Sequence, residues 1–356
     1  MKFVNLQLSV LMLLAIFGCK SESEVILSEP LVGNFIKSPD MGVFIFIDSV
    51  AFGRRTGWAG TVAVMNDSAK VEEVFHTGNG HNEFQRVYYS KGNDNSLLLL
   101  NNPISGDKLL SLTVVPKANN IAAVKDVSSW KKYDLSRLPA FFTSGQYFVS
   151  LSDSTILVLG APYEDRHHIF SVIDFKNQNV TPLAFWPEEG VEGKEGDDAK
   201  CNYFTSNAYL FGNGKGRYFY KHSLDPYSFI FSIDGKKVNI IKRLYSEVSE
   251  YKARGGNYKI TKHARCMEAC ANSRNIYILL MDYDSEGNPL DPDDLKPVYG
   301  KTVEVYDWNG NKQREIHLDR VVKNILVSND NNTLYGQNFY SNRELDTWTY
   351  DLRKDK

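Results

Sequence analysis

The sequence predicts an all-β fold, a six-bladed β-propeller made of four-stranded antiparallel blades. Three observations lead to this prediction: a strand-and-turn pattern that recurs six times, an abundance of aromatic residues, and very little helical periodicity. The chain has 356 residues, among them 20 Phe and 20 Tyr, which favour strands and supply material for a core. A ring of blades also leaves few sheet edges exposed.

Each copy of the repeat is a short strand that ends in a turn, and a second apolar run precedes it. Alternate apolar positions followed by Asp and then Gly or Asn suit a pleated strand that closes on a tight turn. The unit is therefore a hairpin with flanking strands. The six copies, of which the second is degenerate, are Val62–Asp67, Leu110–Val114, Val172–Asn177, Phe231–Gly235, Val303–Gly310 and Trp348–Asp351. The preceding runs are Val43–Ile47, Leu97–Leu100, Ile156–Leu159, Tyr218–Tyr220, Ile276–Leu280 and Thr333–Tyr335.

The last repeat has no fourth strand of its own, because the sequence ends at Lys356. We expect a strand within Glu24–Phe35 to take that place and to close the ring, so that the propeller domain covers residues 30–356. Only Arg243–Tyr251 has apolar residues at helical spacing, and Gly255-Gly256 follows it. We expect a small inserted helix there.

The first 29 residues predict a lipoprotein signal and a tether. Lys2 is followed by an apolar run from Leu6 to Phe17, which is too short to cross a bilayer core of about 30 Å. The run ends at Cys19 in a pattern that resembles a bacterial lipobox, which implies a signal peptide at 1–18 and a lipid on Cys19. Residues 19–29 form the tether, which is polar from Lys20 to Glu24. We therefore expect a protein anchored in the cell envelope, at the outer membrane if Lys20 acts as the sorting residue, with periplasmic and surface-facing orientations both open.

The net charge and the cysteine content limit the classes of function that the protein can have. The net charge is −2, so no basic stripe is available for nucleic acid. Lipidation of Cys19 leaves Cys201, Cys266 and Cys270. We expect Cys201 and Cys266 at equivalent inner-strand positions of consecutive blades, lining the channel. Buried thiols, a Cys201–Cys266 disulfide and a soft-metal site remain alternatives, but Cys266 and Cys270 lie about 13 Å apart in an extended strand, beyond disulfide reach.

We interpret the other polar motifs as structural features and not as functional sites. The acidic segment Pro187–Asp198 matches no calcium-loop spacing and reads as a solvated connector. Neither His167-His168, whose side chains face opposite ways in a strand, nor the Gly212–Gly216 stretch builds a site. No nucleophile elbow, zinc motif or cofactor motif is present, so no catalytic residue, metal or cofactor is assigned.

The chain resembles the TolB-like six-bladed propeller lipoproteins of Gram-negative gut anaerobes. The resemblance lies in Cys19, in the glycine-containing Gly78–Phe84 stretch and in the blade-like strand Ser273–Leu279. His81 and Asn82 depart from the Pro and Gly of that family's pattern. The resemblance implies a fold and an envelope location, and no catalytic residue.

Two functions from different classes follow. The first is a binding or scaffold module for an envelope protein or a glycan, which uses one face of the propeller. The second is a carbohydrate-active hydrolase or lyase with paired carboxylates at the channel mouth. Two or more carboxylates or a His that converge within about 10 Å at the channel mouth favour the enzyme, and a mouth lined by apolar and amide groups favours the binding module.

Overall fold

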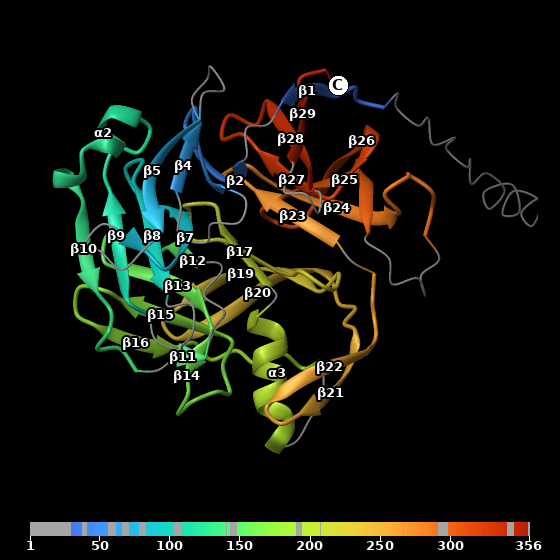
Figure 1. The fold of residues 1–356 in the computed structure, drawn as a ribbon. Coiled ribbons are helices and arrows are strands. Elements are labelled where there is room, and N and C mark those ends of the chain that lie inside the picture. The colour runs from blue at the N-terminus through green and yellow to red at the C-terminus, as the bar shows by residue number, and fades with distance from the viewer. Residues whose placement is uncertain are drawn as a thin grey trace, which may run out of the picture.

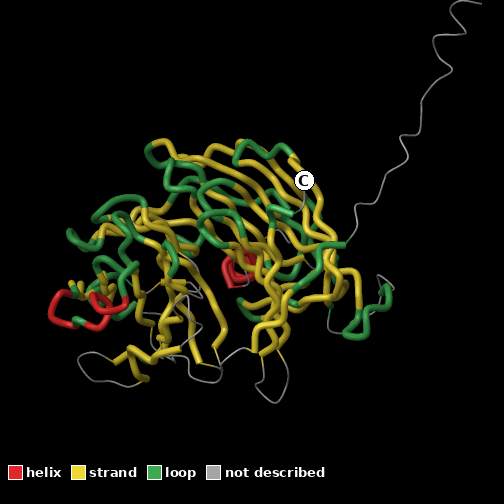
Figure 2. Tube along the Cα trace, turned by 90° about the horizontal axis from the view of Figure 1, so that it is seen from above, coloured by secondary structure: helices red, strands yellow, loops and turns green. Residues whose placement is uncertain are grey.

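The computed structural model is an all-β propeller whose six blades follow one another round a ring (Figure 1). It describes residues 30–37, 41–55, 62–65, 71–77, 83–102, 109–139, 141–142, 148–189, 194–206, 208–265, 267–290, 298–339 and 345–354. Strands predominate in the Cα trace, and helix is confined to short pieces (Figure 2). The predicted fold class is confirmed.

Each blade is an antiparallel sheet whose first strand lies nearest the ring axis. The strands of blades one to three are β2 (Met41–Ile47), β3 (Val50–Arg55), β4 (Val62–Met65) and β5 (Val71–Thr77); β7 (Arg86–Lys91), β8 (Leu97–Asn102), β9 (Ser111–Val115) and β10 (Lys131–Asp134); β12 (Phe148–Ser150), β13 (Thr155–Leu159), β15 (Phe170–Asp174) and β16 (Asn179–Pro182). Three short strands accompany them, β6 (Glu83–Phe84), β11 (Phe141–Phe142) and β14 (Ala161–Pro162).

Blades four to six complete the ring. Their strands are β17 (Ala208–Gly212), β18 (Tyr218–His222), β19 (Ser228–Asp234) and β20 (Lys237–Tyr245); β23 (Met267–Ala271), β24 (Asn275–Tyr283), β25 (Tyr299–Asp307) and β26 (Lys312–Val322); β27 (Asn324–Val327), β28 (Thr333–Phe339), β29 (Leu345–Asp351) and β1 (Asn34–Lys37). The first strands contact one another in the cyclic order β2, β7, β12, β17, β23, β27 and back to β2. This closed order establishes the ring.

The ring closes through the amino-terminal strand, as predicted. β1 pairs antiparallel with β29, with Phe35 opposite Trp348, and so supplies the fourth strand of blade six. Its bounds differ from the expected Glu24–Phe35, because pairing begins at Asn34, after an isolated bridge between Leu31 and Leu318. Residues 24–29 lie outside the described ranges.

The repeat identified in the sequence corresponds to the second and third strands of most blades. Its closing Asp is explained by turn chemistry, since Asp174 and Asp307 accept backbone N–H bonds from residues two to four positions ahead. These bonds lower the pKa of both carboxyl groups. Blade one differs, because its apolar run at 43–47 is the first strand, β2.

Apolar side chains fill the spaces between blades rather than a single central core. The largest cluster joins blades three and four, where Phe170 is fully buried and stands edge-on to Tyr220 and Phe229. Successive residues of an inner strand face different neighbours: Met267 and Ala269 pack toward blade four, while Cys270 packs toward blade six. Blades are therefore joined by face-to-face burial, which fixes their order.

A glycine in β25 gives a first testable prediction. A Cβ on Gly300 would lie 2.2 Å from the carbonyl oxygen of Leu280, so neighbouring backbone would have to move. We expect Gly300→Ala to lower the free energy of unfolding by about 2 to 3 kcal/mol. Gly212→Ala is the matched strand control, because its Cβ would meet only ordinary contacts at 3.5 Å or more. Denaturant unfolding checks both, and equal midpoints would contradict the prediction.

Two segments stand outside the blades. The first holds α2 (Ile121–Lys125) and η1 (Val127–Ser129), between β9 and β10. The second, which we call the cap, consists of α3 (Lys194–Ser206) and the hairpin of β21 (Glu250–Arg254) and β22 (Asn257–Lys262). α3 contacts both hairpin strands, and Figure 1 shows the cap beside blade four, across the ring from β1.

The helix expected at Arg243–Tyr251 is not formed. Arg243, Leu244 and Tyr245 continue β20, and Tyr251 belongs to β21. The Gly255-Gly256 pair, read as a helix end, is the hairpin turn, and both residues have positive φ, 58° and 75°. Conversely, the acidic segment that was expected to be a connector runs into α3. Two pairs of buried residues in α3 are spaced four apart, as on one face of a helix: Ala199 with Tyr203, and Cys201 with Thr205.

Candidate functional site

The cap is fastened to blade four by a stack of aromatic rings. Tyr203 of α3 stacks between Tyr251 of β21, at 4.1 Å between ring centroids, and His222 of β18, at 4.4 Å. Tyr258 of β22 meets the edge of the same Tyr203 ring at 5.1 Å. Tyr203 is fully buried, so this one side chain joins helix, hairpin and blade.

A buried carboxyl group lies beneath this stack. Asp225, in the turn between β18 and β19, has no exposed surface and accepts hydrogen bonds from the Tyr203 and Ser249 hydroxyls. Its Oδ2 lies 3.2 Å from Nδ1 of His222, which is also fully buried. Ser249 in turn accepts the backbone N–H of Ala264, 2.8 Å away. The Asp225 network therefore draws both chain connections of the cap onto blade four.

The hydrogen bonds define where the proton of this pair resides. His222 Nε2 lies 2.9 Å from the carbonyl oxygen of Tyr203, which can only accept, so Nε2 carries a hydrogen. Burial lowers the pKa of His222 well below its usual value, so Nδ1 keeps its lone pair. Burial raises the pKa of Asp225 to about 6. Below about pH 6 Asp225 is therefore neutral, and its Oδ2 lies 3.2 Å from His222 Nδ1, a buried atom that has no hydrogen-bond partner in the described structure.

Lys221, next to His222, is also fully buried. Its ammonium group donates to the backbone carbonyls of His222 and Asp225 and so holds the turn between β18 and β19. The group is thus used by the chain itself. It is not presented to a ligand.

Polar contacts also tie the amino-terminal part of α3 to blade three. Arg166 pairs with Asp198, and His167 Nδ1 lies 3.6 Å from Asp197. The His167 ring stacks on Trp186 at 4.3 Å. His167 and His168 have different partners, since His168 bonds the Leu183 carbonyl at 2.7 Å, but they lie between β14 and β15 and not in a strand as expected.

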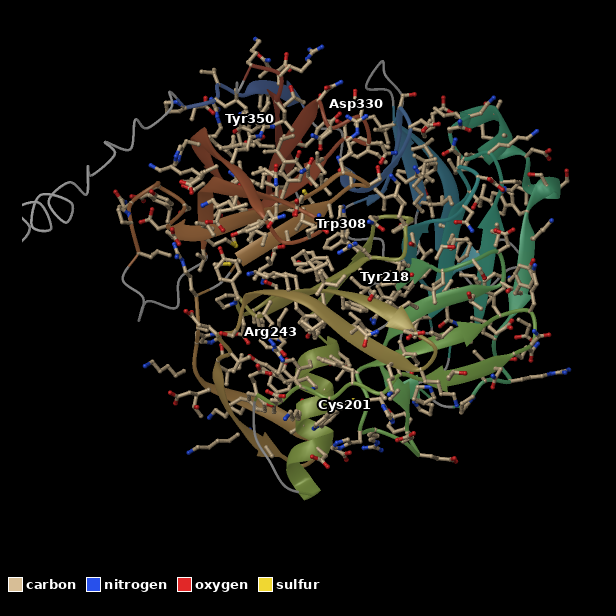
Figure 3. All side chains as sticks on the ribbon, turned by 180° about the vertical axis from the view of Figure 1, so that it is seen from behind. Cys201, Tyr218, Arg243, Trp308, Asp330 and Tyr350 are labelled. Carbon is tan, nitrogen blue, oxygen red and sulfur yellow. The ribbon has the colours of Figure 1, made fainter. Side chains whose placement is uncertain are left out.

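The acidic segment contributes a further anchored carboxylate, Glu189. Glu189 accepts the Tyr227 hydroxyl at 2.9 Å and pairs with Arg243 of β20 at 3.0 Å. It is therefore not a purely solvated connector. Figure 3 shows Arg243 on blade four and Cys201 on α3.

The two described cysteines, Cys201 and Cys270, lie in different parts of the fold. The inner-strand position expected for Cys201 is wrong: it lies in α3, buried, with its Sγ 3.6 Å from the carbonyl oxygen of His168. The similarity of its flanking residues to those of Cys266 did not reflect equivalent positions in the blades. Cys270 does lie on an inner strand, β23, in the apolar cluster toward blade six. Cys201 and Cys270 are free thiols, and Cys266 and Cys19 lie outside the described residues.

Burial predicts that both described thiols are inert. It raises the pKa of Cys201 to about 12 and the pKa of Cys270 well above its usual value, so neither forms thiolate near neutral pH. We expect no alkylation of either cysteine by iodoacetamide at pH 8 in the native protein, and full alkylation after unfolding in guanidinium chloride. Peptide mass mapping identifies each site. Native alkylation of Cys201 would contradict its buried place in α3.

The inner strands carry little that acid–base chemistry could use. Within the six first strands as bounded above, Glu268 of β23 is the sole carboxylate, and none of the six contains His. Tyr209 of β17 donates to Glu268 at 3.2 Å, and burial raises the pKa of Glu268 to about 7 against the opposing charge of Lys221. In the described part of the chain, no group of three or more His, Cys, Asp or Glu is arranged to hold a metal ion.

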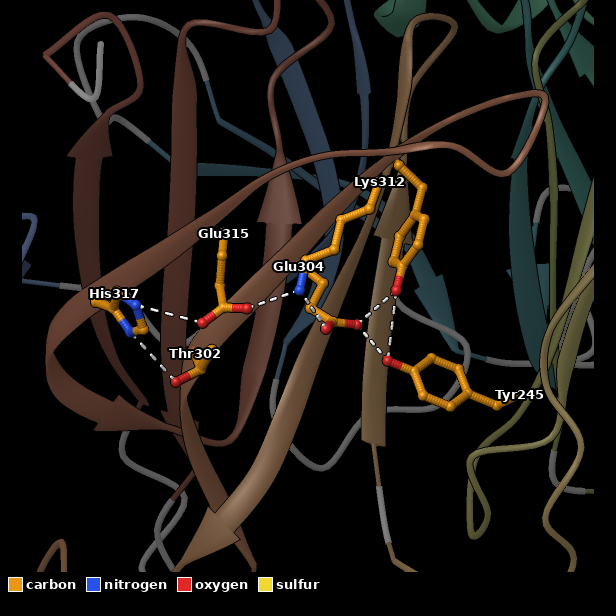
Figure 4. Close-up of polar contacts among 7 residues, drawn as sticks. Tyr245, Thr302, Glu304, Lys312, Glu315 and His317 are labelled. Atoms are coloured by element: carbon orange, nitrogen blue, oxygen red, sulfur yellow. Dashed lines mark hydrogen bonds and ion pairs between the residues drawn. The ribbon is translucent and has the colours of Figure 1, made fainter. Parts of the chain in front are cut away.

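A second carboxylate lies between blades four and five, away from the axis (Figure 4). Glu304 of β25 accepts the hydroxyls of Tyr245 and Tyr306 and pairs with Lys312 at 2.7 Å. These partners lower its pKa, although burial acts in the opposite direction. A carboxylate held by three donors is a structural link between blades. Sequence reasoning missed it because its partners come from three strands.

Comparisons with known proteins give only distant structural likenesses. No protein-family model and no curated protein sequence matches it. Solved structures that resemble it include an oligogalacturonate lyase in complex with manganese (11% identity, 85% of this chain and 74% of that chain, TM-score 0.40). The RRP9 WD40 repeats match at 10% identity over 90% and 97% of the two chains, with a TM-score of 0.43. XC5397 from Xanthomonas campestris, described as a gluconolactonase, matches at 9% identity over 89% of each chain, with a TM-score of 0.47. These likenesses carry no argument about activity.

Proposed function

We propose that the protein is a recognition module of the cell envelope, held to a membrane through a lipid on Cys19, that binds a protein or glycan without converting it. The observation that carries this proposal is the single carboxylate among the inner strands. Hydrolysis by paired carboxylates needs two such groups on either side of the scissile bond. The other buried acids, Asp225 and Glu304, are fully occupied by structural hydrogen bonds.

The cap is the proposed recognition face. Stacked rings and hydrogen bonds fasten the inner side of the cap to blade four. The hairpin forms a separate sheet that belongs to no blade, and an exposed turn joins its two strands. Binding surfaces held on rigid elements lose less entropy when a ligand binds. The cap therefore combines a fixed position with an open outer surface.

The lipid anchor fits the place where the described chain begins. Val32 and Phe35, 70% and 56% exposed, follow the tether directly and lie on the blade-six side of the ring. Exposed apolar side chains beside a lipid anchor suit contact with a bilayer surface. Among the described helices, none is long and apolar enough to cross a membrane. Anchored this way, the protein presents the cap away from the bilayer (Figure 1).

Affinity capture tests this proposal. The intact chain, expressed with its native amino terminus, is recovered from detergent-solubilised membranes, and co-purifying proteins and glycans are identified together. We expect a saturable ligand, loss of membrane fractionation in Cys19→Ala, and loss of the ligand when the cap surface is altered. Capture that is unaffected by cap substitutions would contradict the assignment of the recognition face.

Glu268 provides the test of the alternative, a carbohydrate-active hydrolase or lyase. A carboxyl group with a pKa of about 7 has the protonation range of a general acid at neutral pH. We expect Glu268→Gln, which preserves the shape of the side chain and the bond with Tyr209, to bind the captured ligand as tightly as the unaltered protein. If the unaltered chain degrades that ligand and Glu268→Gln does not, the binding proposal would be wrong and the protein would be the carbohydrate-active enzyme.

A further inference from the structure

The outer face of the cap hairpin is strongly basic in a protein whose net charge is −2. The side chains of Lys252, Arg254, Lys259 and Lys262 are all exposed, and Glu250 is the only carboxylate of the hairpin. The opposite face holds Tyr251, Ala253, Tyr258 and Ile260, which are buried or half-buried toward α3. We call the four cations and their surface the basic face.

The pairing register places like charges together. Lys252 is directly opposite Lys259, and Arg254 is opposite Asn257, while only Lys262 has a carboxylate partner, Glu250. Like charges directly opposite one another destabilise an antiparallel pair. The fold therefore bears a repulsion that an anionic ligand would relieve. Residues two apart on a strand are about 6.6 Å apart, so the cations form a row suited to a linear polyanion.

The basic face also lies where a soluble ligand can reach it. The hairpin that carries it lies well apart from β1, so a chain anchored near β1 holds the basic face away from the bilayer (Figure 1). This separation favours a polysaccharide over anionic lipid headgroups. We propose that the basic face binds a linear anionic polysaccharide, one that bears uronate or sulfate groups. This inference rests on the proposed recognition function and names its ligand class.

The experiment measures binding to immobilised chondroitin sulfate, with amylose as the uncharged probe. We expect the intact protein to bind chondroitin sulfate and not amylose, with affinity falling as salt is raised. Lys252→Ser with Lys259→Ser should weaken binding about tenfold, since two exposed ion pairs are lost. Lys131→Ser with Lys176→Ser removes the same charge from exposed positions on blades two and three, and should leave binding unchanged. Because it relieves repulsion, the cap double variant should unfold at the same denaturant concentration or a higher one.

Three outcomes would overturn the inference. The first is binding of chondroitin sulfate that survives the cap double variant. The second is equal binding to phosphatidylglycerol vesicles that is lost in the same variant, which would show that the face reads lipid. The third is capture of an uncharged glycan or a protein by the intact chain, with no binding of chondroitin sulfate at low salt. In that third case the proposed recognition function stands without this ligand class, whereas failure to capture any ligand would count against the function itself.

Discussion

Replacing Asp225 by alanine is expected to lower the free energy of unfolding by about 3 to 5 kcal/mol. The substitution removes the acceptor of the Tyr203 and Ser249 hydroxyls, both of them buried, and takes away the carboxyl group that lies 3.2 Å from His222 Nδ1. Buried polar groups that lose their partners cost about 1 to 3 kcal/mol each. Equilibrium denaturation in urea, followed by tyrosine fluorescence and far-UV circular dichroism, measures the change.

A matched control shows whether the loss of stability is specific to Asp225 or follows from removal of any aspartate. Asp234 is the exposed last residue of β19, so Asp234→Ala should change stability by no more than about 0.5 kcal/mol. Limited proteolysis adds a local readout. In Asp225→Ala we expect cleavage in the cap before the blades, because the network holds both connections of the cap. Equal stability of the two variants would show that Asp225 does not fasten the cap.

The second large effect that we expect is a change in the pH dependence of stability when Asp225 is replaced by asparagine. In unfolded chains Asp titrates near 3.9 and His near 6.5, so between about pH 4 and 6 the unfolded pair holds one proton, on His222. The folded pair also holds one, on Asp225, whose pKa is about 6, while His222 stays neutral. Alone, the raised pKa of Asp225 would stabilise the folded state at low pH, and this stabilisation would be lost as the pH rises to 6. The lowered pKa of His222 would stabilise the folded state above pH 6.5, and this stabilisation would be lost as the pH falls. In the native pair the two contributions cancel.

Asparagine removes only the Asp225 part of this balance. The stability of the variant relative to the unaltered protein should therefore fall as the pH is lowered below 6, by up to about 1.4 kcal/mol for each pH unit over which the buried His222 stays neutral. Other groups titrate equally in both proteins and drop out of the difference. Urea unfolding at pH 4, 5, 6 and 7 gives the difference curve. A difference that does not change with pH would refute the shared proton.

The ring could be predicted from the sequence because its signals are local. Alternating strands such as Val303–Asp307 and the closing turn at Asp307 follow from strand and turn chemistry within ten residues. Ring closure was predicted for a similar reason, because blade six lacks one strand and the chain ahead of blade one can supply it. The bounds of that strand were wrong, since its register is set by contact with β29.

The cap could not be predicted, because its signals depend on contacts distant in sequence. The first residues of α3 include Gly196 and two aspartates, which obscure its helical period, and its buried face contacts Tyr251 and His222 through Tyr203. The reverse error at Arg243–Tyr251 has the same origin. Leu244 and Tyr245 pack toward blade five, and that contact selects a strand where spacing alone suggests a helix.

Product analysis of the captured ligand tests the central claim, recognition without conversion, most directly. The purified chain is incubated with its ligand, with Glu268→Gln and the cap double variant alongside, and the ligand is then sized by mass spectrometry. The account predicts a ligand of unchanged mass in all three samples, and bound fractions that fall only in the cap variant. Fragments that appear with the unaltered chain and not with Glu268→Gln would contradict it.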